Sequence, residues 1–408
     1  MAIRIEATTL IPGRGDVVEN GVVILEDSVI RFAGSATDAP DTPNADVVFT
    51  DSVMPGMWEC HGHFIGIYTA NIEETVTTRP QLAAMRTTAD AVSVLNAGFT
   101  SVREMGGMGT FLGRAIDEGQ VVGPNVYASG SMLSMTGGHG DAHGMDLGAA
   151  RLTRSRNWGE DNIVDGPDQC RAGVRRMLRL GAKVIKIHAS GGVMSELDDP
   201  HLPQFSKPEL DAIVDEATRM ERLVGAHCHG KRGIMAALEA GIMTIEHGTY
   251  LDEEAADAMA ETGAILVPTR FVVDFLMSEG DKRGMPEYAK KKAQAASEAH
   301  SDAVTLAHQR GVKIAMGTDI WMTGLWGRNG EELSLLVDCG MTPLEAIETA
   351  TANGPATLGP QAPNAGQLLE GMDGDVICIS GDPTTDVSIL GDPSNITHVF
   401  KAGVKVKG

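Results

Sequence analysis

An alternation of short apolar runs with longer helix-like segments fills the middle of the chain and most constrains its fold. Segments with helical periodicity, such as 207–222 and 233–241, separate most of these runs. Apolar strands alternating with helices are typical of a parallel sheet, because crossover helices cover its faces. The runs are 57–64, 100–106, 125–130, 182–189, 222–230, 244–249, 264–269 and 312–319. Eight parallel strands followed by helices predict an α/β fold of the closed (β/α)8 type, a TIM-type barrel.

The two ends of the chain have a different sequence pattern, in which short strand-like stretches are separated by Gly, Asp and Pro. We expect them to pair with each other, so that residues 1–54 plus 358–408 form a small β-sandwich and residues 55–357 form the barrel. A doubly wound open sheet is the competing topology, but no G-x-G-x-x-G opens the first strand-to-helix turn. The long connection 270–310 is a candidate lid over the barrel mouth.

Charge and composition exclude several classes of partner. The chain has 33 Lys+Arg against 55 Asp+Glu, a net charge of −22, which disfavours binding to nucleic acid or to an anionic membrane. No apolar stretch reaches membrane-spanning length, and no signal peptide is visible. The five cysteines lack C-x-x-C spacing, which argues against a disulfide framework and predicts a cytoplasmic location.

Histidine, lysine and aspartate side chains gather late in the predicted strands, where barrel enzymes place their chemistry. His61 and His63 point to the same face, because side chains alternate along a strand. His227 and His247 are 20 residues apart, one βα repeat, and therefore lie on neighbouring strands. Four histidines and an aspartate match the ligands that Zn²⁺ prefers. The full set is His61, His63, Lys186, His188, His227, His229, His247 and Asp319.

Lys186 stands in "AKVIKIHASGG", an otherwise apolar strand. A charged ammonium there costs several kcal/mol without a partner, so a buried lysine can lower its pKa and stay neutral. A neutral amine can add CO₂ and become a carbamate, which has a negative charge and two oxygens that can bridge two metals. A purely structural lysine is the alternative.

Taken together, these motifs resemble the amidohydrolase superfamily along nearly the whole chain. The matching motifs are "HGH" after "VMPG", then "IKIHASGGV", "AHCHG", "IEHG" and "GTD" in that order. "TGGHGD" at 136–141, with "IKIHASGGV", resembles more narrowly the imidazolonepropionase-related branch. That branch includes binuclear-zinc dipeptidases and carboxypeptidases acting on Xaa-Pro, Xaa-Arg or Xaa-Lys. It also includes amidases that cleave N-acyl amino acids or carbamate-like xenobiotics.

The resemblance implies two zinc ions per chain, with a carbamate on Lys186 as the bridge between them. Asp319 would bind the more buried ion and act as general base on the bridging hydroxide. His229 receives no ligand role, since the family ligand corresponds to the first histidine of "HCH". A homo-oligomer is also implied. The other ligands would be His61 and His63 at the more buried ion, and His227 and His247 at the second.

Several further residues have candidate roles near these ligands. His139 and His143 lie in the Gly-rich "SMTGGHGDAHG", read as a substrate clamp for a terminal carboxylate, with a flexible loop as the alternative. Tyr250 could donate its hydroxyl to substrate or pack at the rim. By strand alternation, Cys60 and Cys228 should face out of the barrel.

These features predict a metal-dependent amidohydrolase that releases a C-terminal amino acid from a dipeptide or N-acyl amino acid. The alternative is hydrolysis of a xenobiotic amide or carbamate, including N-acyl-phenylalanine toxins. A deaminase of the same fold usually carries Glu three residues after the fifth-strand histidine, where this chain has Gly230. A non-catalytic barrel would have lost ligands, and a serine hydrolase would need a G-x-S-x-G elbow.

Overall fold

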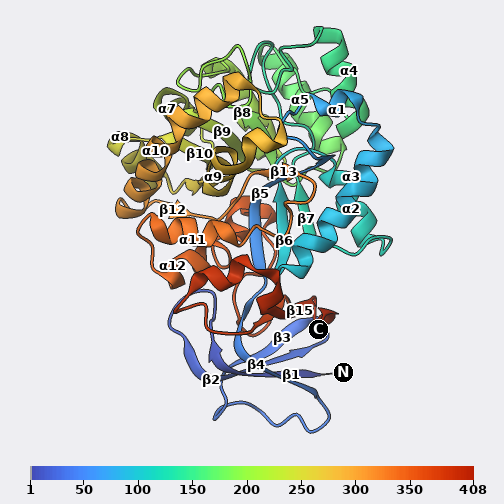
Figure 1. The fold of residues 1–408 in the computed structure, drawn as a ribbon, viewed down its shortest axis with the longest axis vertical. Helices are drawn as coiled ribbons and strands as arrows, with labels where there is room; N and C mark the ends of the chain where they lie inside the picture. The colour runs from blue at the N-terminus through green and yellow to red at the C-terminus, as the bar shows by residue number, and fades with distance from the viewer. Residues whose placement is uncertain (1) are drawn as a thin grey trace.

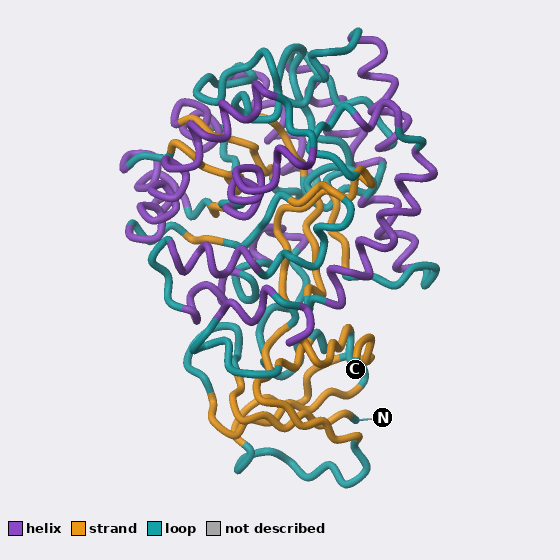
Figure 2. The backbone as a smooth tube through the Cα atoms, viewed as in Figure 1, coloured by secondary structure: helices purple, strands orange, loops and turns teal. Residues whose placement is uncertain are grey.

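The computed structural model describes residues 2–408 as a barrel with a β-sheet domain at one end (Figure 1). Both termini enter the sheet domain, where the last strands lie against the first (Figure 2). Its seven strands are ordered β16-β15-β14-β4-β1-β2-β3. They are β1 Ile3–Leu10, β2 Val18–Glu26, β3 Val29–Ser35, β4 Asp46–Pro55, β14 Val376–Ile379, β15 Ile396–Lys401 and β16 Val404–Lys407.

Strand β4 joins the two ends of the chain. It pairs in parallel with β1 and antiparallel with β14. The N-terminal and C-terminal strands therefore belong to one continuous sheet, in agreement with the predicted pairing of the two ends. Their apolar side chains form a small core of their own, which includes Val23, Val53, Val376 and Phe400.

All eight predicted barrel strands are present. Two parallel sheets contain them, ordered β13-β5-β6-β7 and β12-β11-β10-β9-β8. Backbone hydrogen bonds join the sheets at both sides: Lys183 N donates to Ala128 O at 2.8 Å, and Cys60 N to Met316 O at 3.0 Å. The strands thus follow barrel order. They are β5 Met57–Ile67, β6 Phe99–Glu104, β7 Asn125–Ala128, β8 Ile185–His188, β9 Val224–Gly230, β10 Thr244–Tyr250, β11 Ile265–Val267 and β12 Lys313–Ile314, with β13 Ile320–Met322 beside the end of β5.

The helices surround the strands, and local sequence explains where they begin. In α6 the Ser206 side chain and Glu209 form a capping box, which satisfies backbone N–H groups at the helix start. Leu210, Ile213 and Ala217 then repeat at helical spacing and are buried. The helices are α1 Glu74–Thr77, α2 Pro80–Asn96, α3 Gly109–Asp117, α4 Leu147–Trp158, α5 Pro167–Arg179, α6 Lys207–Arg219, α7 Lys231–Glu239, α8 Glu253–Thr262, α9 Arg270–Glu279, α10 Glu287–Gln309, α11 Glu331–Asp338 and α12 Pro343–Thr349.

The connection 270–310 forms helices α9 and α10, joined by the 3₁₀ turn Gly280–Arg283. Val272 and Leu276 of α9, with Ala293 and Ala296 of α10, line the cavity that contains the strand-end histidines. The connection therefore covers the barrel mouth, where the sequence placed a lid. Along residues 2–408, no helix combines the length and apolar character needed to cross a bilayer.

The two cysteines beside proposed ligands face opposite ways. Cys228 lies against Gly233 of α7, outside the barrel, as strand alternation predicts. The outward prediction for Cys60 is wrong, because the β5–β6 register shifts between Glu59 and Gly62 and turns Cys60 inward. Cys60 packs with side chains of non-neighbouring strands, which meet only in the barrel interior. That interior cluster is Trp58, Cys60, Met105, Val184, Ile265, Val267, Ala315, Leu358 and Ala365.

Candidate active site

The side chains predicted as metal ligands converge on one cavity at the C-terminal ends of the strands. His63 Nε2 lies 3.0 Å from Asp319 Oδ1, and His61 Nε2 lies 3.7 Å from the same oxygen. Lys186 Nζ is 3.2 Å from His61 Nε2. The cavity brings together His61, His63, Lys186, His227, His247 and Asp319, and His139, His188, His229 and His300 also line it.

Possible ligand atoms form two adjoining groups. His61, His247 and Asp319 each offer one atom within 4.8 Å of the others, and so do His227, His229 and His247. Because His247 belongs to both groups, the groups have one residue in common. Each group offers the donor types that bind a divalent metal ion. The second group also includes His229, to which the family resemblance assigns no ligand role.

Hydrogen bonds on the far side of each imidazole fix its orientation. The Nδ1 atoms of three histidines are occupied, which leaves their Nε2 atoms free to face the cavity. His227 is reversed: its Nε2 lies 3.3 Å from the Gly191 carbonyl, so its Nδ1 is the free nitrogen. The three Nδ1 contacts are His61 with Glu246 at 2.7 Å, His63 with the Gly106 carbonyl at 2.7 Å, and His247 with Thr269 Oγ1 at 2.8 Å.

A buried ion pair behind His61 was missed by the sequence reasoning. Arg103 Nη2 lies 2.7 Å from Glu246 Oε2, the oxygen that also contacts His61. Burial opposes ionisation of Glu246, but the Arg103 charge and the His61 hydrogen bond bring its pKa well below the usual range. The pattern could have been found, since Glu246 directly precedes His247 in "IEHG" and Arg103 interrupts an apolar strand.

Burial strongly affects the pKa values of the ionisable side chains in the cavity. It lowers the pKa of His61 to about 4, with the Lys186 charge adding to the effect. It lowers the pKa of Lys186 to about 8, although Glu246 and Asp319 oppose the shift. Burial favours neutral Asp319, but the His63 hydrogen bond and nearby positive charges lower its pKa overall. A neutral imidazole, a partly neutral amine and a carboxylate are the forms that bind metal.

Two proposed ligands occupy an unusual backbone conformation. His247 has φ of 73° and Asp319 has φ of 58°, and Thr269, which hydrogen-bonds His247, also has φ of 58°. The left-handed region is unfavourable for residues other than glycine and persists only where the surroundings impose it. Such residues cluster at functional sites, which agrees with their place in the cavity wall.

A second cavity adjoins the first and is called the outer cavity below. His63, His139, His188 and Asp319 line both, so the outer cavity leads directly to the ligand cluster. Its wall combines apolar side chains with charged ones. The apolar members include Ile65, Ala70, Ile72, Met132, Met194 and Trp321, and the further charged members are Glu73, Asp141, Arg154 and Glu196.

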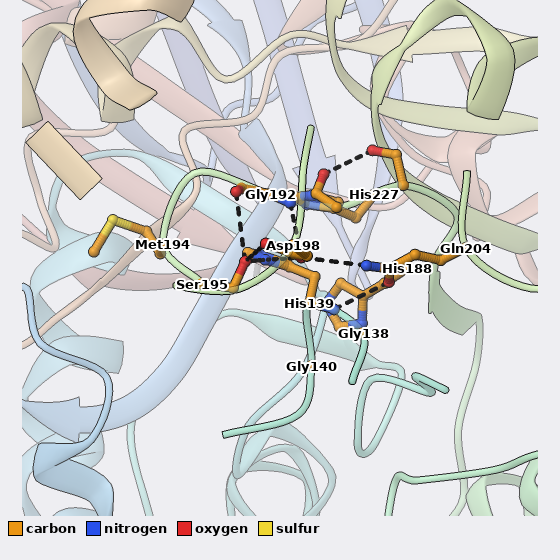
Figure 3. A network of polar contacts seen from close by, with 12 residues as sticks. Gly138, His139, Gly140, His188, Gly192, Met194, Ser195, Asp198, Gln204 and His227 are labelled. Atoms are coloured by element: carbon orange, nitrogen blue, oxygen red, sulfur yellow. Dashed lines mark hydrogen bonds and ion pairs between the residues drawn. The ribbon is translucent and has the colours of Figure 1, made fainter. Parts of the chain in front are cut away.

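A chain of polar contacts positions His139 where the two cavities meet (Figure 3). Its Nδ1 lies 2.7 Å from Ser195 Oγ, which itself donates to Asp198. Because the single hydroxyl hydrogen goes to the carboxylate, Ser195 Oγ accepts from His139 Nδ1–H. Lys292 of α10 binds Asp198 Oδ1 at 3.2 Å, which ties the helix over the mouth to this loop. The Gln204 side chain accepts from the His139 backbone N–H at 3.0 Å.

Two other candidate residues lie differently. His143 lines the outer cavity, but Nε2 donates to the Gly138 carbonyl at 3.0 Å, while Nδ1 accepts from the Leu197 backbone N–H at 3.1 Å. Both ring nitrogens are thus used within the loops. The structure does not bring Tyr250 to either cavity wall: its ring packs 4.1 Å from that of His201, at the rim.

Comparison with known proteins gives consistent matches. The sequence model of the amidohydrolase family matches residues 52–406. Ochratoxinase from Aspergillus niger is 42% identical, over 99% of this chain and 86% of that protein. The crystal structure of A. niger ochratoxinase has a TM-score of 0.92 at 40% identity, covering 100% of this chain and 96% of that one. A prolidase crystallised with N-methylphosphonate-L-proline has a TM-score of 0.92 at 32% identity, with both chains fully covered.

Proposed function

The chain belongs to the amidohydrolase family, and we propose that it hydrolyses an amide bond to release the C-terminal amino acid of an N-acyl amino acid or dipeptide. Metal-dependent hydrolysis of an amide C–N bond follows from the family and its ochratoxinase and prolidase relatives. The convergence of six ligand-type side chains on one cavity is the observation that carries the proposal.

We propose that this donor set holds two zinc ions. We assign His61, His63 and Asp319 to the more buried ion and His227 and His247 to the second. A carbamate on Lys186 would bridge them: the neutral amine forms an N–C bond to CO₂ and loses a proton. The lowered pKa of Lys186 and its contact with His61 support this assignment. Bound divalent cations would lower the pKa of a water molecule and polarise the scissile carbonyl.

Asp319 is the proposed catalytic residue. Its lowered pKa keeps it ionised near neutral pH, so its carboxylate can take a proton from the attacking water. The same group can then deliver that proton to the leaving amine. Ochratoxinase acts on ochratoxin, an N-acyl phenylalanine, which makes such a compound a second candidate substrate. The apolar side chains in the wall of the outer cavity can contact a bulky aromatic group of such a substrate.

The test is a substrate screen on zinc-loaded protein, with N-acyl amino acids, Xaa-Pro dipeptides, an ochratoxin-type amide and aryl carbamates. We expect release of free amino acid and about two zinc per chain by elemental analysis. Asp319→Asn should reduce kcat by roughly 10²–10⁴-fold. One zinc with ammonia release would indicate a deaminase, and a metal-free, inactive protein would contradict the proposal.

The proposal also covers the oligomeric state and the cellular location of the protein. A homo-oligomer, expected from the family, is checked by light scattering on the eluted protein. A cytoplasmic location is supported by the cysteines, all five of which are buried and unpaired among residues 2–408. Localisation of a tagged full-length chain tests it.

A further inference from the structure

An arginine without a counter-charge lies in the wall of the outer cavity. Arg154 of α4 is only 8% exposed, and its Nη1 is fully buried with no hydrogen-bond partner. Within residues 2–408, its guanidinium makes no hydrogen bond or ion pair and stacks 4.1 Å above the Trp158 ring. Burying a charge without a partner costs several kcal/mol, so the folded chain holds a cation that lacks its anion.

The Arg154 guanidinium stays positively charged at neutral pH, and the carboxylates that line the outer cavity do not pair with it. Burial lowers the pKa of Arg154 to about 10, and Asp141 opposes the shift. Glu73, Asp141 and Glu196 line the same cavity, yet none is within 4 Å ion-pair distance of Arg154. One Asp141 oxygen instead accepts from the Gly137 backbone N–H at 2.9 Å. The guanidinium is therefore free to bind an anion that enters from outside.

The cavity that Arg154 lines also reaches the proposed metal ligands His63 and Asp319. A molecule with its amide bond at the ligand cluster would extend along this cavity toward α4. We propose that Arg154 binds a carboxylate of the substrate through the planar fork of its guanidinium, and so selects N-acyl amino acids and peptides with a free carboxylate. This inference rests on the proposed function and names the substrate class of that same site.

Arg154 thereby takes the role that the sequence suggested for His139. His139 donates its Nδ1–H to Ser195, so Nε2 of the neutral ring has only a lone pair to offer, whereas the guanidinium has unused donors. The carboxylate has two chemical sources: the α-carboxylate of the released amino acid, or an acid on the acyl group. N-benzoyl-L-phenylalanine carries only the first, N-succinyl-L-phenylalaninamide only the second, and N-benzoyl-L-phenylalaninamide neither.

The test compares these compounds on zinc-loaded wild type, Arg154→Met, Arg154→Lys and Arg156→Met. Arg156 lies exposed on the same helix and is a matched control for loss of one positive charge. We expect Arg154→Met to lower kcat/KM roughly 10- to 100-fold for one of the two acids, mainly through KM, and to leave the neutral amide within about 2-fold. Arg154→Lys should recover part of the loss, because it restores charge without the fork.

Equal losses on the acids and on the neutral amide would show a purely structural arginine and overturn the proposal. So would no loss on either acid, or an Arg156→Met variant that behaves as Arg154→Met does. If wild type hydrolyses none of the compounds, the proposed function fails, but calorimetric binding still decides this inference. An acid that binds wild type roughly 10-fold or more tighter than Arg154→Met supports it, and equal affinities overturn it.

Discussion

Lys186 is the residue on which a two-metal centre depends most. It is buried among histidines and Asp319, where an unmodified ammonium would oppose cation binding. A carbamate reverses the sign of that charge. Substitution of Lys186 therefore distinguishes a carbamate that bridges two metal ions from a purely structural lysine.

We expect Lys186→Ala to bind less than half of the wild-type zinc and to lose more than about 100-fold in kcat/KM, beyond the range for residues that only orient a ligand. A short carboxylic acid such as propionate should restore part of the activity, because it supplies the missing oxygens. Lys183→Ala, an exposed lysine three residues earlier, is the control. Full zinc content in Lys186→Ala would show that the side chain does not bridge the metals.

Glu104 gives a pH prediction that is independent of the metal ligands. Burial raises its pKa from 4.5 to about 8, against opposing backbone hydrogen bonds from Gly109 and Gly106. Between pH 4.5 and about pH 8, the Glu104 carboxyl group is ionised in the unfolded chain and protonated in the folded chain. Stability from this group is therefore complete below pH 4.5 and falls by about 1.4 kcal/mol per pH unit up to about pH 8.

Glu104→Gln removes this titration while keeping the shape of the side chain. The difference in melting temperature between Glu104→Gln and wild type should therefore shift in favour of the variant as the pH rises from 5 to 8, and then level off. Scanning calorimetry at fixed ionic strength measures it. Glu261→Gln, at an exposed position of α8, should show no such trend. A constant difference for Glu104→Gln would mean that Glu104 is ionised in the folded protein.

At the scale of the elements, strands were predictable and their irregularities were not. Apolar runs bounded by turn residues identified β5 to β12, because burial on both faces of a parallel strand leaves a continuous apolar sequence. The bulge that turns Cys60 inward has no comparable pattern, since it depends on pairing with β6. The contacts that run from His139 through Ser195 to Asp198 could not be predicted either, because loops far apart in sequence form them.

The Arg103–Glu246 pair joins β6 to β10 across the barrel interior. Both side chains are fully buried, and Glu246 also holds His61 in place. Arg103→Met should destabilise the fold by about 3–5 kcal/mol, because it leaves a buried carboxylate without its partner. The double variant Arg103→Met/Glu246→Gln should recover much of this loss in urea unfolding. If the single and double variants unfold alike, the pair does not stabilise the fold through its charge.

At the scale of the whole molecule, the sheet domain has a small core of its own and also shares a buried cluster with the barrel. Ile377 and Ile379 of β14 and Val399 of β15 belong to the same buried cluster as the helices around the barrel. Leu358, at the proposed domain boundary, lies in the barrel interior itself. The predicted division at residues 54 and 358 follows a change in sequence pattern, but buried side chains from both sides of this boundary pack together. The tail therefore contributes to barrel stability.

We accordingly expect a fragment of residues 55–357 to be insoluble or unfolded by circular dichroism. Burial of one large apolar side chain contributes about 1.5–3 kcal/mol. Loss of the C-terminal members of the shared core thus removes on the order of 10 kcal/mol, comparable to the total stability of a domain. The control ends at Gly403 and lacks only β16, an edge strand with no fully buried residue. It should fold and bind zinc. A 55–357 fragment that unfolds cooperatively and retains its zinc would instead show that the barrel is an independent domain.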